Sequence, residues 1–139
     1  MAALAEMIRV VRPGGRALVV DGDHESTVVD SPYADVTRRF LAFRAGTLEQ
    51  GGIAHRCFAL FQSLGLLDVG VEALVRVSTD YEALNRVMHY DGGIRVAATH
   101  AVVTSEEAAR WVEAIEGAAR MGRFLCATTF FLTVGRKPS

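Results

Sequence analysis

A short polar segment near the start of the chain holds the residues best suited to chemistry. Residues 21–25, with the sequence DGDHE, bring three carboxylates and one imidazole together directly after the apolar run ALVV at residues 17–20. A histidine beside a carboxylate can act as a general base, because the ordinary pKa of histidine is close to neutral pH. Asp23 and His24 are therefore the predicted catalytic residues. The alternative, and the more ordinary interpretation, is a solvated loop whose aspartates cap turns.

A second group of candidates lies further along the chain. Tyr81, His89 and Tyr90 could line a substrate pocket between a helical region and a sheet, since their rings suit a small organic molecule. Aromatic residues at helical spacing more often serve burial, so core packing is the alternative. These three residues are the predicted substrate-binding group.

The composition limits what the chain can bind. Its 139 residues, half of them hydrophobic, suffice for one domain with its own core. A net charge of −1 with mixed signs removes the basic footprint of nucleic-acid or anionic-membrane binding, so neither partner is expected. The histidines and the cysteines Cys57 and Cys126 lack metal-ligand spacing, which predicts no metal and two buried free thiols. The sequence shows no apolar run of membrane-spanning length and no leader, so a cytoplasmic location is expected.

Apolar periodicity and turn residues predict a succession of helices and strands. Helices are predicted over residues 2–11, 32–50, 53–64, 80–90 and 105–121, and strands over residues 16–21, 68–78 and 124–134. The glycine pairs at 14–15, 51–52 and 92–93 are interpreted as helix stops. Thr79 with Glu82, and Thr104 with Glu107, match the capping box, in which a hydroxyl and a carboxylate satisfy free backbone amides at a helix start. The polar segment at 21–25 thus follows a buried strand, where open α/β sheets bind ligands.

Three segments, in this order along the chain, resemble the C-terminal half of a class I S-adenosylmethionine-dependent methyltransferase. Residues 4–16 (LAEMIRVVRPGGR) are similar to the helix and turn before the family's fifth strand. Residues 61–69 (FQSLGLLDV) are similar to the turn before its sixth strand, and residues 130–138 (FFLTVGRKP) to its closing seventh strand. The similarity is greatest to the small-molecule branch that includes ubiquinone- and menaquinone-type methyltransferases.

The resemblance implies a fold and a domain organisation. The fold would be α/β, a partial Rossmann-like sheet of about three strands with the last one antiparallel, flanked by helices. Residues 1–139 would form a single domain, the C-terminal portion of the methyltransferase fold. Residues 79–122 would form a helical cap inserted within it.

The resemblance also implies S-adenosylmethionine-dependent methyl transfer to a small-molecule substrate. The family builds its cofactor site on its first four strands, and this sequence has no counterpart of them. It also has no Gly-x-Gly-x-x-Gly turn between a strand and a helix. No cofactor-binding residue is therefore assigned, and the chain is expected to supply the substrate-side half only.

The missing strands have consequences for partners and for activity. The first strand would lack its usual neighbour, so the chain is expected to form a homo-oligomer through exposed sheet edges or to be completed by a separate N-terminal half. The alternative function is a catalytically inactive binding or assembly domain derived from a methyltransferase. The sequence leaves open whether the chain alone is an enzyme.

Overall fold

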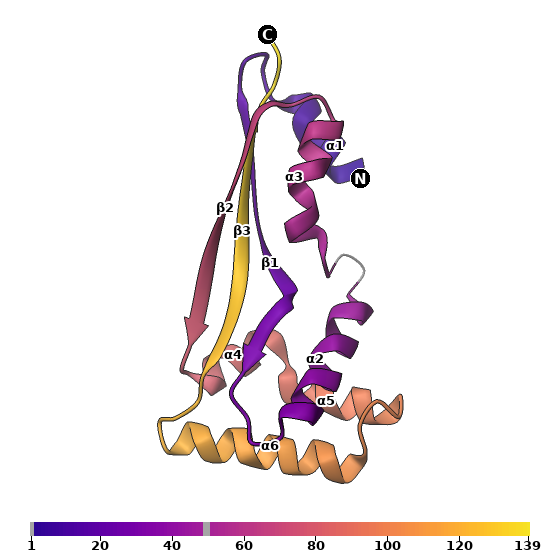
Figure 1. The fold of residues 1–139 in the computed structure, drawn as a ribbon, viewed down its shortest axis with the longest axis vertical. Coiled ribbons are helices and arrows are strands. Elements are labelled where there is room, and N and C mark those ends of the chain that lie inside the picture. The colour runs from indigo at the N-terminus through magenta and orange to yellow at the C-terminus, as the bar shows by residue number, and fades with distance from the viewer. Residues whose placement is uncertain (1, 49–50) are drawn as a thin grey trace. The chain divides into compact units, whose positions relative to one another are not determined.

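The computed structural model describes residues 2–48 and 51–139, which form six helices and three strands (Figure 1). The strands make one open antiparallel sheet in the order β1-β3-β2. The predicted α/β class and the antiparallel last strand are confirmed. The elements are, in chain order, α1 (Ala2–Val10), β1 (Arg16–Val29), α2 (Ala34–Thr47), α3 (Ile53–Ser63), β2 (Leu67–Ser78), α4 (Tyr81–Met88), α5 (Tyr90–Thr99), α6 (Ser105–Arg120) and β3 (Cys126–Arg136).

The chain divides into two compact units, and each strand contributes residues to both. The first unit comprises residues 1–23, 52–74 and 129–139, and the second comprises residues 24–51 and 75–128. Each unit has its own cluster of buried apolar side chains, so each is described separately below.

In the first unit, α1 and α3 pack on the sheet through Ile8, Ala17, Phe61 and Leu66. The turn after α1 contains Gly14 at a φ of +71°, a conformation that glycine adopts without strain. Lys137 then binds the end of this helix: its Nζ donates to the backbone carbonyls of Ile8, Arg9 and Val11 at 3.0, 2.9 and 2.8 Å. A cation on the last carbonyls of a helix also complements the helix dipole.

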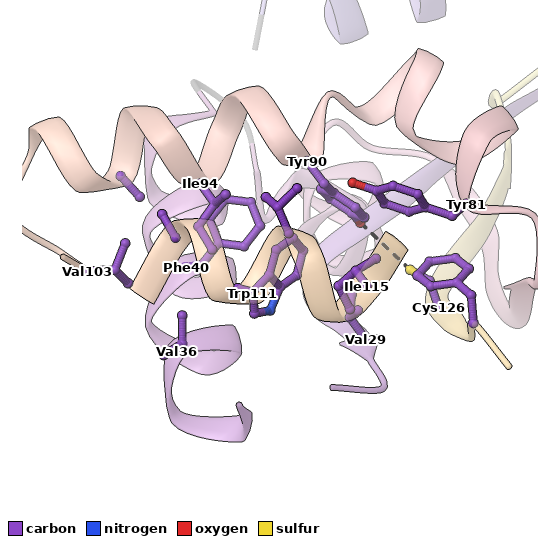
Figure 2. Packing of buried hydrophobic residues seen from close by; sticks show 14 residues of the cluster. Val29, Val36, Phe40, Tyr81, Tyr90, Ile94, Val103, Trp111, Ile115 and Cys126 are labelled. Atoms are coloured by element: carbon purple, nitrogen blue, oxygen red, sulfur yellow. Dashed lines mark hydrogen bonds between the residues drawn. The ribbon is translucent and has the colours of Figure 1, made fainter. Parts of the chain in front are cut away.

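In the second unit, α2, α4, α5 and α6 enclose the larger cluster of buried side chains (Figure 2). Trp111 of α6 is completely buried, packs edge-on against Phe40 of α2, and donates from Nε1 to Thr37 Oγ1 at 2.8 Å. Arg39 of α2 joins α6 by donating to Glu107 and to the carbonyl of Val102. The second unit is thus held by apolar packing together with a few satisfied polar contacts.

Two details of the predicted helices are wrong, each for a physical reason. The N-cap of α4 is Asp80 instead of Thr79, because the Asp80 carboxylate accepts from the amide of Ala83. The glycines at 92–93 do not stop a helix but lie inside α5, where Gly93 lets the backbone approach the ring of Phe40. The chain turns instead at His89, which has a φ of +50°.

The first strand is also longer than predicted, since it runs through residues 21–25 to Val29. Long-range pairing extends it: Asp30 donates to the carbonyl of Leu125, and the hydroxyls of Thr27 and Thr128 lie 3.1 Å apart. The predicted helix end at Gln50 lies outside the described residues, and α2 ends at Thr47. No helix within the described residues combines the length and the apolar character needed to cross a bilayer.

Candidate functional site

The first unit contains a carboxylate and an imidazole in contact. Nδ1 of His55 lies 3.3 Å from Oδ1 of Asp23. The Asp23 side chain is 10% exposed, whereas that of His55 is 41% exposed. One ring nitrogen of His55 thus contacts a nearly buried carboxylate, while the rest of the ring is exposed to solvent. This is the arrangement of an oriented general base.

The two elements that carry this pair are fixed by apolar packing. In β1, Ala17 is buried and Val19 packs against the same cluster, so alternate side chains of this strand turn toward the helices. In α3, Ala54, Cys57 and Phe61 are buried, and this face holds the first turn of the helix close to the strand. His55 lies in that first turn, so its position depends on the seating of α3.

The carboxylate of Asp21 acts electrostatically on the thiol of Cys57 in the same unit. Burial raises the pKa of the Cys57 thiol, and the nearby carboxylate of Asp21 raises it further. The thiolate is the nucleophilic form of cysteine, and both effects disfavour it. Cys57 is therefore a buried thiol, as predicted, and is not a candidate nucleophile.

The second unit contains a cavity of about 760 Å³ between the later residues of β1 and α2. His24 and Glu25 are among the residues that line it, and Thr37, which binds Trp111, is another. Small-molecule sites commonly have this size and this mixture of apolar walls and a few polar groups. Further lining residues are Thr27, Val29, Ser31, Ala34, Leu41 and Ala42.

The two predicted catalytic residues belong to different units. Asp23 is in the first unit and contacts His55, whereas His24 is in the second unit and lines the cavity. The sequence pattern therefore predicts a role for Asp23 but not for His55, which lies 32 residues away on α3. The available signal is the position of Asp23 on an alternating strand. It lies four residues from Val19 and six from Ala17, both of which face the helices.

The predicted substrate-binding residues take part in the fold of the second unit. Tyr81 and Tyr90 are buried in its core, while His89 is exposed at the turn between α4 and α5. Burial raises the pKa of Tyr81 to about 12, and its hydroxyl finds no hydrogen-bond partner among the described residues. Burial also raises the pKa of Tyr90, whose hydroxyl lies 3.8 Å from Sγ of Cys126 (Figure 2).

Glycines of the three Gly-Gly pairs take part in the turns and packing of the fold. The backbone amide of Gly14 donates to the carbonyl of Lys137, and that of Gly51 donates to the carbonyl of Leu48. These two amides are therefore engaged within the chain. Gly93 lies inside α5 against Phe40. Within residues 2–48 and 51–139, no turn from a strand into a helix is rich in glycine, and no three metal-binding side chains cluster.

Comparison with known proteins finds a distant similarity to a longer protein. No family model matches the chain. The chain is 26% identical over 135 residues to an uncharacterized 37.1 kDa protein in transposon TN4556 of Streptomyces fradiae. The match covers 96% of this chain but only 38% of that protein, so the chain spans well under half the length of this relative.

Proposed function

We propose that this chain forms the substrate-side portion of an S-adenosylmethionine-dependent methyltransferase that acts on a small molecule. The observation that carries the proposal is the sheet order: the last strand, β3, pairs with the first strand, β1, and runs antiparallel. The helices α4 to α6 lie between β2 and β3 in the chain, where the resemblance requires an inserted helical cap. This combination supports the family resemblance beyond the three sequence segments.

In this proposal, the reacting side chain on this portion is His55. With the N–H of Nδ1 donating to the Asp23 carboxylate, the lone pair of the imidazole is at Nε2. Nε2 then accepts a proton from the nucleophilic atom of the substrate, and Asp23 stabilises the imidazolium that forms. The pair thus gives the chain a chemical role that needs no residue of the cofactor site.

The methyl donor is assigned to residues outside this chain. The lack of a glycine-rich turn from a strand into a helix among the described residues, together with the 38% coverage of the transposon protein, supports a longer polypeptide that holds the donor. The small-molecule substrate then lies on the side that His55 faces.

A complementation experiment tests the proposal. The reading frame that precedes the segment in its genome is expected to encode a strand, a glycine-rich turn and a helix. The joined polypeptide should bind S-adenosylhomocysteine with a micromolar Kd in a calorimetric titration, and the 139-residue chain alone should show no heat of binding. If the joined polypeptide also shows no heat of binding, or if no such segment exists, the methyltransferase proposal is wrong.

The role of His55 is tested separately in the active polypeptide. His55→Gln should lower kcat by about 10²–10⁴-fold, the usual contribution of a positioned base. Arg56→Gln is the matched control, because Arg56 is the exposed neighbour of His55 on α3. Equal losses in the two variants would show that the imidazole has no specific role.

One observation favours a second candidate, the inactive binding or assembly domain. The cavity beside α2 needs no cofactor and is complete within the second unit. A chain that binds a small apolar molecule there with unchanged affinity after His55→Gln, and that shows no methyl transfer in the joined polypeptide, would be such a domain.

A further inference from the structure

β2 is an edge strand whose apolar side chains are exposed. It is one continuous strand of 12 residues and lies at the end of the strand order, so one side of its backbone is unpaired within the described chain. Val71, Leu74, Val75 and Val77 are 44% to 60% exposed. A long apolar edge of this kind is a template for pairing with a further strand.

The sequence of β2 lacks the features that prevent such pairing. Edge strands are commonly protected by lysine, by proline or by very short length. The strand LDVGVEALVRVS has neither lysine nor proline. Beyond Asp68 at its start, its charged residues are Glu72 and Arg76. Those two charges are of opposite sign, lie on the same face of the strand, and are each two residues from Leu74.

This spacing is complementary to itself. In an antiparallel pair of two β2 strands with the two-fold axis at Leu74, Glu72 lies opposite Arg76 of the other copy, and this contact occurs twice. Val71 lies opposite Val77, and Ala73 lies opposite Val75. The other register that pairs opposite charges, Asp68 against Arg76, places Glu72 directly opposite its own copy and is therefore disfavoured.

The other edge of the sheet does not have this property. β1 carries Asp21, Asp23 and Glu25, so an antiparallel self-pairing centred on Asp23 would place like charges opposite each other. β1 is also irregular, because residues 15–30 lie against the shorter segment 125–137, which contains β3. Extra residues of this kind form bulges, which discourage further pairing.

We propose that β2 is the surface through which two copies of this chain associate. The strands pair antiparallel about a two-fold axis at Leu74 and join two three-stranded sheets into one. The occupant is a second copy because the charges and apolar residues of β2 match those of the same strand reversed. An isologous contact of this kind closes at two copies and leaves β1 at both outer edges.

A charge-swap experiment tests the interface. The purified chain should be a dimer by light scattering at micromolar concentration. Glu72→Arg and Arg76→Glu each convert two attractive contacts into two repulsive ones and should raise the dimer Kd about tenfold or more. The double variant with both substitutions restores opposite charges and should return the Kd to within a few-fold of the starting value.

Crosslinking tests the register. Leu74→Cys should form an intersubunit disulfide under mild oxidation, because directly opposite residues have Cα atoms about 4.5–5.5 Å apart. Glu72→Cys is the control, since its two copies would lie about 13 Å apart along the strands and should not crosslink. The native thiols of Cys57 and Cys126 are buried.

Several outcomes would overturn the proposal. A monomeric chain means that β2 stays unpaired or is covered by another segment. If neither single charge reversal changes the dimer Kd, the copies associate elsewhere. Equal crosslinking yields at positions 72 and 74 would mean the same. Open-ended assemblies in place of a dimer would equally exclude a two-fold contact at Leu74. Failure of the methyltransferase proposal leaves this test unaffected, because it uses no cofactor or substrate.

Discussion

Replacement of Gly135 by alanine tests the packing that positions His55. Gly135 lies in β3 beneath the end of α3. A Cβ added there would meet Cβ and Cδ1 of Leu66 and Cδ2 of Phe61, each at 3.0 Å. Carbon atoms pack best at about 3.5–4.0 Å, so the alanine must displace α3 or the turn that follows it.

The expected loss follows from two opposing effects. Overpacking a core typically costs about 1–3 kcal/mol. Removing the backbone freedom of a glycine stabilises the folded state by about 0.4–1 kcal/mol when the native conformation allows alanine. Gly135→Ala should therefore lower the free energy of unfolding by about 1–2 kcal/mol.

Gly70 of β2 provides the matched control in the same unit. A Cβ at Gly70 would meet only Cγ1 of Val134, at 3.8 Å, which is an ordinary contact. Gly70→Ala should leave the free energy of unfolding unchanged or raise it by up to about 1 kcal/mol. Urea unfolding followed by far-ultraviolet circular dichroism, with an unchanged m-value, measures both variants. Equal stability of the two variants would refute the seating of α3 on β3.

Three further substitutions test other contacts. Lys137→Met removes three charge-assisted bonds to the end of α1 and should lower the free energy of unfolding by about 1–2 kcal/mol, whereas an unchanged urea midpoint would contradict them. Thr37→Val leaves the buried N–H of Trp111 without its acceptor and should cost about 1–3 kcal/mol, while Thr37→Ser should retain most of the stability. Arg39 and a backbone bond hold the pKa of Glu107 below its usual 4.5, so this carboxylate stabilises the fold above that pH and the contribution is lost as the pH falls below it. Glu107→Gln should therefore flatten the fall of Tm in acid, and parallel Tm profiles would argue against the ion pair.

The elements that the sequence predicted well are those determined by neighbouring residues. The helix Ser105–Arg120 begins at the capping box of Thr104 and Glu107, in which both hydrogen bonds are present. Its buried residues repeat at steps of three and four, including Trp111 and Ile115. Both signals lie within one or two turns of the helix, so they can be read without any knowledge of the rest of the fold.

The elements that were predicted wrongly depend on distant contacts. Gly92 and Gly93 interrupt helices in isolation, yet α5 continues through them because Gly93 fits against Phe40 and the helix is buried along Ile94 and Ala97. Packing of this kind outweighs the helix propensity of glycine, which is worth only about 1 kcal/mol per residue. The second half of β1 likewise becomes a strand because β3 supplies its partners.

The candidate site shows the same division between local and distant information. An aspartate on a strand whose alternate residues face a helix must find a polar partner, because a buried carboxylate without one is costly. That argument applies to Asp23 from its position in β1 alone. The position of Asp23 does not show which histidine it contacts, since His24 is adjacent and His55 is 32 residues away on another element. The choice is made by the apolar face of α3, where Ala54 and Cys57 fix the rotation of the helix and so direct His55 toward the strand. A change in that face should therefore disturb the Asp23–His55 contact as surely as a change in either residue.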